Sequence, residues 1–192
     1  MARTVHILGI SGSLRKASSN SGLLRAAAQL LPANMTMDVF DLAPLPLYNA
    51  DLDGPNAPGS VVELKKRIAA ADALLIATPE YNYSVPGVLK NAIDWASRPP
   101  AESPLTGKPV AMLGAGAAMG TVRAQAHLRQ ILQFNGTLPL QKPEVYVSRA
   151  AEKFDSQGNL TDEDTKKHVR ALLEALYAWV LRLSPEGDQR RD

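Results

Sequence analysis

The sequence predicts an α/β fold in which a five-stranded parallel sheet is covered by helices on both faces. Five short apolar segments alternate with five helical segments along the chain, an alternation typical of parallel sheets. The strand segments are apolar at consecutive positions, which indicates that both faces of the sheet are buried. We expect one domain over residues 1–192, with a flexible tail from about residue 185.

The first third of the chain predicts two strands and a helix. Residues 5–10 (VHILGI) form a β-branched apolar run that ends in a loop rich in serine and glycine. Apolar residues then recur at helical spacing as far as Leu31, and Pro32 ends this helix. Residues 35–40 (MTMDVF) alternate as a second strand, whereas residues 41–59 contain four prolines and indicate a long surface loop.

The middle of the chain predicts a third strand between two helices. Residues 60–71 form a helix for which Ser60 is the expected N-cap. The apolar run at 73–78 (ALLIAT) is the third strand. Residues 84–97 form the next helix, with Ser84 as its expected cap and a proline near its first turn.

The last part of the chain completes the alternation. Residues 109–116 (PVAMLGAG) predict a fourth strand, and residues 120–136 predict a helix that ends at a glycine. A fifth strand is expected at 144–148 (EVYVS). The final helix is expected from about Thr161 to Leu183.

The composition excludes several functional classes. The absence of cysteine removes disulfides, thiol nucleophiles and thiolate metal sites, and the three histidines lack metal-ligand spacing, so we expect no metal. The net charge of +2 suits a phosphorylated small ligand and is too scattered for nucleic acid. We see no signal peptide and no membrane span, and therefore expect a cytoplasmic protein.

Three of the predicted loops have an unusual composition, namely those after the first, third and fourth strands. Ligands of parallel sheets bind outside the carboxyl ends of the strands. In the strand order 2-1-3-4-5 these three loops are neighbours and would converge on one crevice. Periodicity does not determine this order, but the positions of the three loops agree with it.

The loop after the first strand, SGSLRKASSN at 11–20, has the composition of an anion site. A helix N-terminus offers unpaired N–H groups, serine hydroxyls add donors, and Arg15 adds a planar guanidinium that matches phosphate. The alternative is a solvated serine-rich turn with an ordinary cap at Ser19 or Asn20. The segment lacks the nucleophile-elbow, Walker and G-x-G-x-x-G patterns.

The loop after the third strand, PEYNY at 79–83, combines aromatic and hydrogen-bonding side chains. A planar ring system needs apolar faces for stacking and donors along its edge, and this loop supplies both. The alternative is a structured loop whose tyrosines only cover the core.

These two segments strongly resemble the NADPH-dependent FMN reductase family, in particular its chromate/quinone reductase branch. The resemblance rests on GISGSLRKASSN near the start and TPEYNYSVPGVLKNAIDW in mid-chain, and it runs nearly end to end. It implies a flavodoxin-like fold that holds FMN without a covalent bond. It also implies a homodimer or homotetramer.

The resemblance also implies which residues hold FMN. The phosphate would be held by Ser11, Ser13, Arg15, Ser18, Ser19 and Asn20. The ring would be bordered by Pro79, Glu80, Tyr81, Asn82 and Tyr83, with backbone N–H groups of the last two at its N5/O4 edge. Glu80 is expected to order the loop through hydrogen bonds rather than to take part in the chemistry.

The glycine-rich segment at 114–121 is interpreted as the third wall of this crevice. It reads G-x-G-x-x-x-G, one residue longer than the dinucleotide fingerprint, and no acidic residue follows at the expected distance. At Gly116 the absence of a side chain would let the backbone approach the flavin. We therefore include Gly116 among the cofactor-binding residues.

The expected activity is transfer of hydride from NADPH, with NADH as an alternative donor, through FMN to quinones. Chromate, azo compounds and free flavin are expected as further acceptors. Because the flavin carries the chemistry, no catalytic side chain is required. The alternatives are a non-enzymatic electron carrier like flavodoxin and a regulatory module that keeps the fold without flavin. The mildly basic charge argues against the carrier, because such carriers tend to be strongly acidic.

Overall fold

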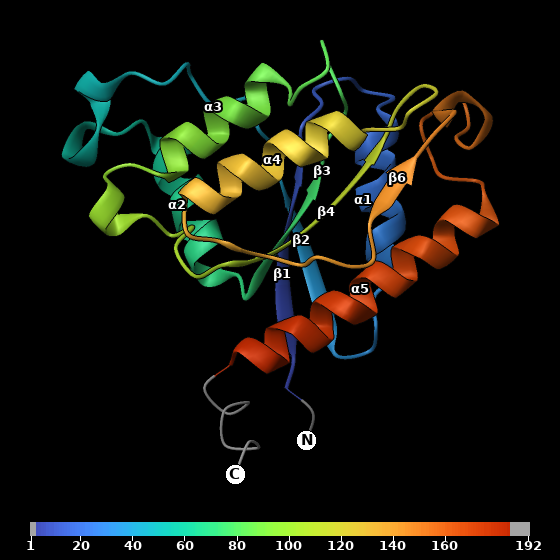
Figure 1. The fold of residues 1–192 in the computed structure, drawn as a ribbon. Helices are drawn as coiled ribbons and strands as arrows, with labels where there is room; N and C mark the ends of the chain where they lie inside the picture. The colour runs from blue at the N-terminus through green and yellow to red at the C-terminus, as the bar shows by residue number, and fades with distance from the viewer. Residues whose placement is uncertain (1–2, 185–192) are drawn as a thin grey trace.

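The computed structural model describes residues 3–184 as one parallel sheet between two layers of helices (Figure 1). The strand order is β2-β1-β3-β4-β5, and β6 also pairs with β4. This confirms the predicted order. The strands are β1 (Val5–Ser11), β2 (Met35–Phe40), β3 (Ala73–Ala77), β4 (Pro109–Ala115), β5 (Leu138–Pro139) and β6 (Val145–Val147).

The described sheet has six strands rather than the predicted five. The predicted fifth strand is β6, which pairs with the end of β4. The additional strand, β5, has two residues and pairs with the start of β4 at Pro109 and Val110. Two residues that include a proline carry no alternation, so the sequence offered no signal for β5.

The helices divide between the two faces of the sheet, as Figure 1 shows. On one face lie α1 (Ser19–Gln29) and α5 (Glu163–Leu183), and on the other lie α2 (Gly59–Ala70), α3 (Gly87–Ala96) and α4 (Val122–Phe134). Each face has its own buried core, because alternate residues of a strand point in opposite directions. In β1, Ile7 belongs to the first core and Leu8 to the second.

Two predicted helix caps are wrong. Ser60 lies inside α2 and its hydroxyl donates to the carbonyl of Pro44, while Pro58 takes the N-cap position. Ser84 lies before α3, whose N-cap is Pro86. In both cases a proline occupies the N-cap position and makes no side-chain hydrogen bond. The statistical preference for serine at N-caps therefore predicted the wrong residue, although a proline stands two residues away.

The long loop at 41–59 is confirmed as irregular, with two short 3-10 helices at Ala50–Leu52 and Gly54–Asn56. Its Tyr48 packs edge-on against Trp95 of α3, and Trp95 donates from its indole N–H to the carbonyl of Pro46. None of the helices in residues 3–184 has the length and hydrophobicity to cross a bilayer. The predicted tail from residue 185 lies outside the described residues.

Candidate functional site

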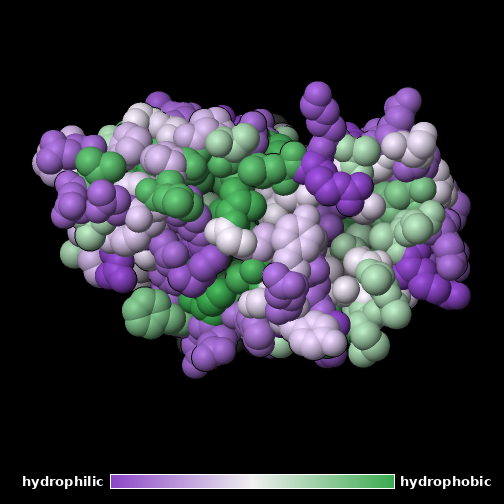
Figure 2. Space-filling model, turned by 90° about the horizontal axis from the view of Figure 1, so that it is seen from above, coloured by the Kyte–Doolittle hydropathy of each residue, from purple (hydrophilic) through white to green (hydrophobic). Residues whose placement is uncertain are grey.

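The loops that follow β1, β3 and β4 meet at a cleft of about 420 Å³ at the carboxyl edge of the sheet. Figure 2 looks onto this edge and shows hydrophobic and hydrophilic residues side by side. Leu14, Tyr81 and Met119 are among the exposed apolar side chains of these loops. The volume is within the range of about 300–1,000 Å³ typical of small-molecule sites.

Nine of the twelve predicted binding residues line this cleft. They are Ser13, Arg15, Ser18, Ser19, Asn20, Pro79, Glu80, Tyr81 and Gly116. The other three are not part of this lining: the Ser11 hydroxyl contacts the backbone of Ser13, and Asn82 and Tyr83 follow Tyr81 in the chain. Ala115 and Ala117 of the predicted third wall also line the cleft, together with three residues outside every predicted segment, namely Arg149, Ala150 and Ala151.

The N-terminus of α1 points polar groups at the cleft. Ser18 is the N-cap, and its hydroxyl oxygen accepts from the backbone N–H groups of Asn20 and Ser21 at 3.2 and 3.3 Å. The alternative caps at Ser19 and Asn20 are therefore wrong. Within residues 3–184, neither the Ser19 hydroxyl nor the Arg15 guanidinium has a hydrogen-bond partner in the chain.

Asn20 has a different environment from the serines of its loop. Its side-chain N–H donates to the carbonyl of Ala115 at 3.0 Å, and its side-chain oxygen accepts from the Ala115 N–H at 2.9 Å. Its side chain is buried, and both polar atoms bind the end of β4. Asn20 therefore joins α1 to the third wall of the cleft. Ser11 is likewise held within the chain, with its Oγ 3.0 Å from Oγ of Ser21.

Residues 81–84 form a tight turn at the mouth of the cleft. Tyr81 and Ser84 exchange two backbone hydrogen bonds, each 3.0 Å long. Between them Asn82 and Tyr83 have φ values of 50° and 64°, which is the left-handed region. Two successive residues of this kind make a turn of type I′, which non-glycine side chains adopt at a cost in strain. The turn leaves the N–H groups of Asn82 and Tyr83 without a partner in the described chain.

Glu80 connects this turn to α4. Its side chain is 8% exposed and accepts from the backbone N–H groups of Arg123 and Ala124 at 3.0 and 3.2 Å. Arg123 also donates from Nε at 2.6 Å and forms an ion pair with the same carboxylate. The guanidinium of Arg123 lies 3.8 Å from the centre of the Tyr83 ring. Glu80 thus orders the loop through hydrogen bonds, as expected, and neutralises the N-terminus of α4.

The pKa of Glu80 lies below its ordinary value. Burial alone would raise this pKa, because it disfavours the ionised carboxylate. Hydrogen bonds from Arg123 and from the backbone of Ala124 outweigh burial and favour the charged form. Glu80 is therefore ionised at neutral pH, and its charge is taken up by Arg123.

The third wall is built from two segments that are bonded to each other. Gly116 donates its N–H to Val147 and accepts from the N–H of Ala150, both at 3.0 Å. A side chain at Gly116 would collide with the carbonyl of Gly120. Arg149 follows β6 in the chain and enters the cleft only through this tertiary contact. No motif in the sequence marks it.

The donors around the cleft fit a phosphate and a planar ring. The lining of the cleft includes serine hydroxyls and two arginines, and it also includes Pro79, Tyr81 and Gly116. Such donors suit a phosphate monoester, and Pro79 with Tyr81 offers apolar surface for an aromatic ring. Within residues 3–184 no His, Asp and Glu side chains gather in a group of three that could hold a metal ion.

Comparison with known proteins agrees with this geometry. Residues 5–152 match the family of NADPH-dependent FMN reductases. The chain is 52% identical to an NAD(P)H-dependent FMN reductase of Pseudomonas aeruginosa over 184 residues, which are 95% of this chain and 99% of the relative. It is 43% identical to a 2-hydroxy-1,4-benzoquinone reductase of Burkholderia over 172 residues, 89% and 93% of the two chains.

A solved structure shows the same likeness. The flavoenzyme NAD(P)H:(acceptor) oxidoreductase FerB of Paracoccus denitrificans superposes with a TM-score of 0.83 at 38% identity. The match covers 93% of this chain and 98% of FerB. From the family match, the two relatives and this structure, we conclude that the chain belongs to the NADPH-dependent FMN reductase family and is an FMN-dependent NAD(P)H oxidoreductase.

Proposed function

We propose that this chain uses NADPH to reduce quinones at the cleft described above, with chromate, azo compounds and free flavin as further acceptors and NADH as an alternative donor. FMN supplies the hydride chemistry when it is bound. The observation that carries this proposal is that the polar α1 N-terminus and the 79–81 loop line the same cleft. We also propose that the chain acts in the cytoplasm, where NADPH is available as the donor.

The residues of the chain would bind and orient the reactants. Ser13, Ser18, Ser19 and Arg15 would hold the phosphate, and Asn20 would keep α1 against the third wall. Pro79, Tyr81 and Gly116 would border the ring. The free N–H groups of Asn82 and Tyr83 would donate to its edge, where they stabilise negative charge. Glu80 and Arg123 would hold this turn in place.

The visible spectrum of the purified protein tests the proposal. We expect a flavin spectrum that anaerobic NADPH bleaches in a single two-electron step and that a quinone restores. A flavin spectrum that NADPH leaves unchanged, or a stable one-electron form, would favour the electron carrier instead. Failure to bind FMN at all would overturn the assignment of both loops.

Replacing Arg15 with alanine tests the phosphate site directly. Arg15→Ala is expected to weaken FMN binding by about 1.5–3 kcal/mol, the contribution of a hydrogen bond to a charged group. Titration of the apoprotein with FMN measures this change. Lys16→Ala is the matched control, because Lys16 is the next residue and lies outside the cleft lining. An FMN dissociation constant equal to that of the unchanged protein would remove Arg15 from the site.

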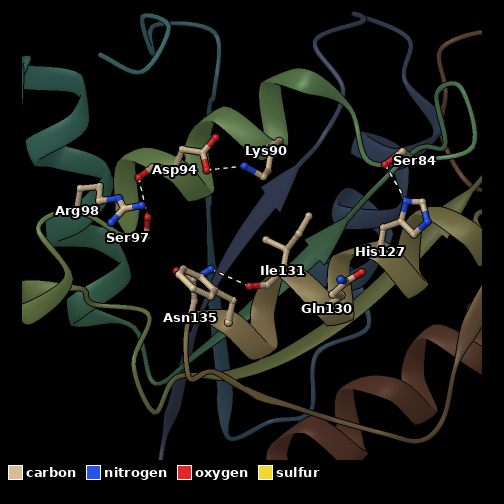
Figure 3. Close-up of a pocket in the computed structure, with 10 residues that line it drawn as sticks. Ser84, Lys90, Asp94, Ser97, Arg98, His127, Gln130, Ile131 and Asn135 are labelled. Atoms are coloured by element: carbon tan, nitrogen blue, oxygen red, sulfur yellow. Dashed lines mark hydrogen bonds and ion pairs between the residues drawn. The ribbon is translucent and has the colours of Figure 1, made fainter. Parts of the chain in front are cut away.

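We further propose that the chain forms a homodimer, or a homotetramer built from such dimers, through a groove between α3 and α4 (Figure 3). The groove holds about 520 Å³, and Phe134, one of the residues that line it, is 81% exposed. Its walls carry both signs of charge, because Nζ of Lys90 lies 2.6 Å from Oδ1 of Asp94. A surface with both signs can pair with a second copy of itself about a twofold axis.

This groove adjoins the mouth of the cleft. Figure 3 shows the Ser84 hydroxyl facing Nδ1 of His127, and the two atoms are 2.9 Å apart. Ser84 closes the turn that would border the ring, so a second copy bound here would lie next to the reactants. We expect Phe134→Glu to shift the molar mass measured by light scattering toward that of the single chain. Val62→Glu, an exposed apolar position on α2, is the control. An unchanged mass for Phe134→Glu would exclude this groove as the interface.

A further inference from the structure

Arg149 borders the same cleft as Arg15, although it comes from a distant part of the chain. It has φ 49° and ψ 50°, a left-handed conformation that costs a non-glycine residue about 1 kcal/mol or more. Two hydrogen bonds hold it there. The N–H of Arg149 donates to Ala117 at 2.9 Å, and the N–H of Ala150 donates to Gly116 at 3.0 Å. The backbone that carries this guanidinium is therefore anchored to the wall of the cleft.

The side chain of Arg149 has no strong partner within residues 3–184. It is 69% exposed, and its ion pair with Glu152 is long, 3.8 Å, with Glu152 itself 64% exposed. Pairs of this kind contribute little, because water screens both charges. The guanidinium is thus available to a ligand that enters the cleft.

The charge of the cleft points to an anionic ligand. Its lining contains Arg15, Arg149 and the carboxylate of Glu80. The charge of Glu80 is taken up by Arg123. Two positive charges therefore remain without a matching negative charge in the lining. A phosphate monoester carries close to two negative charges at neutral pH and three acceptor oxygens, which match two arginines.

We propose that Arg149 binds a phosphate monoester of a ligand in this cleft. The inference rests on the proposed function, because two phosphate monoesters belong to its reactants. One is the phosphate of FMN, and the other is the 2′-phosphate that distinguishes NADPH from NADH. In the first case Arg149 is a cofactor-retention residue, and in the second it sets the choice of nicotinamide donor.

Three variants separate these cases. Arg149→Gln removes the charge and keeps a non-glycine residue, so the strain of the left-handed backbone is unchanged. Arg149→Lys keeps the charge but loses the planar fork. Lys153→Gln removes one positive charge four residues along, outside the cleft lining, and controls for net charge.

Two measurements are made on each variant. Apoprotein is titrated with FMN and with riboflavin, which lacks the phosphate. Holoprotein saturated with FMN is assayed with NADPH and with NADH, with the same quinone as acceptor. We expect Arg149→Gln to lose about 10- to 100-fold for one phosphate-bearing ligand, the value of one charged hydrogen-bonded contact, and Arg149→Lys to recover part of this loss.

Each outcome decides the inference. A weaker affinity for FMN with unchanged riboflavin affinity assigns Arg149 to the FMN phosphate. A fall in kcat/KM for NADPH with unchanged kcat/KM for NADH assigns it to the 2′-phosphate. Equal losses for FMN and riboflavin, or changes no larger than those of Lys153→Gln, overturn the inference. If the unchanged protein neither binds FMN nor oxidises NADPH, it is the proposed function that fails.

Discussion

Replacing Glu80 with alanine is expected to lower the free energy of unfolding by roughly 3 kcal/mol, because this change leaves three partly buried donors without their acceptor. The carboxylate is 8% exposed and accepts from two backbone N–H groups and from the guanidinium of Arg123. Alanine offers none of these hydrogen bonds. The Arg123 side chain is 41% exposed, so water can replace part of the hydrogen bonding that it loses. We therefore expect a destabilisation near the lower end of the range for breaking a buried ion pair.

Urea unfolding of the apoprotein measures this effect without interference from bound flavin. Glu152→Ala is the control, because Glu152 also faces an arginine but is 64% exposed at a distance of 3.8 Å. We expect a much smaller change for this control. Equal changes in unfolding free energy for the two variants would show that Glu80 contributes no more to stability than an exposed carboxylate does. Because Glu80 anchors the 81–84 turn, we also expect Glu80→Ala to weaken FMN binding.

The stability contributed by Glu80 should depend on pH with a definite sign. Hydrogen bonds lower its pKa in the folded protein below the ordinary value of 4.5. Its ionised form therefore stabilises the fold above about pH 4.5, and this contribution is lost as the pH falls through the lowered pKa. The difference in unfolding free energy between the unchanged protein and Glu80→Gln should shrink over that range. A difference that stays constant from pH 6 to about pH 3 would contradict this account.

The sheet could be predicted from the sequence because its central strands β1, β3 and β4 are buried on both faces. Runs such as ALLIA at 73–77 are apolar throughout, and this pattern is typical of parallel strands that are buried on both faces. Periodicity does not determine the strand order, but the positions of three loops of unusual composition agree with the order that the structure shows. The short β5 was missed because two residues carry no pattern.

The residues of the site could be predicted where they lie in one continuous segment of the chain. They could not be predicted where only tertiary contacts bring them to the cleft. The loops at 11–20 and 79–83 each carry their chemistry in one continuous segment, and nine of the twelve residues predicted from these two loops and the third-wall glycine line the cleft. Arg149 joins them only because its backbone is bonded to Ala117. The family resemblance places Asn20 with the phosphate-binding serines, whereas its amide binds Ala115 in β4. Neither contact can be predicted from a local pattern in the sequence.

Adding a single methyl group at Gly22 on α1 is expected to have the second large effect on the stability of the fold. In an exposed helix, exchanging glycine for alanine stabilises by about 1 kcal/mol, through the lower conformational entropy of the unfolded chain. Here a Cβ atom would collide with the backbone carbonyl of Gly158 and lie 3.3 Å from the Phe154 ring. The carbonyl of Gly158 is held by Arg25 at 2.9 Å, and Gly158 itself has φ 76°.

The added methyl group would therefore meet a backbone carbonyl that Arg25 and the left-handed conformation of Gly158 hold in place. Overpacking of this kind costs about 1–3 kcal/mol or more. We expect the overpacking to outweigh the helix propensity, so that Gly22→Ala destabilises the protein in urea unfolding. Gly59→Ala is the matched control, because Gly59 begins α2 and a methyl group added there would have no atom within 4 Å. This control should be neutral or stabilising.

The position of Gly22 ties this stability effect to the site. Gly22 donates its N–H to the carbonyl of Ser18 at 2.8 Å, so the turn that contains it is the one that presents Ser18 and Ser19 to the cleft. A shift of α1 away from Gly158 moves these donors relative to Ala115 and Gly116. Gly22→Ala should therefore also weaken FMN binding, although Gly22 itself lies outside the cleft lining. If Gly22→Ala is as stable as Gly59→Ala and binds FMN equally well, α1 is free to move, and the phosphate site does not depend on its close packing against Gly158.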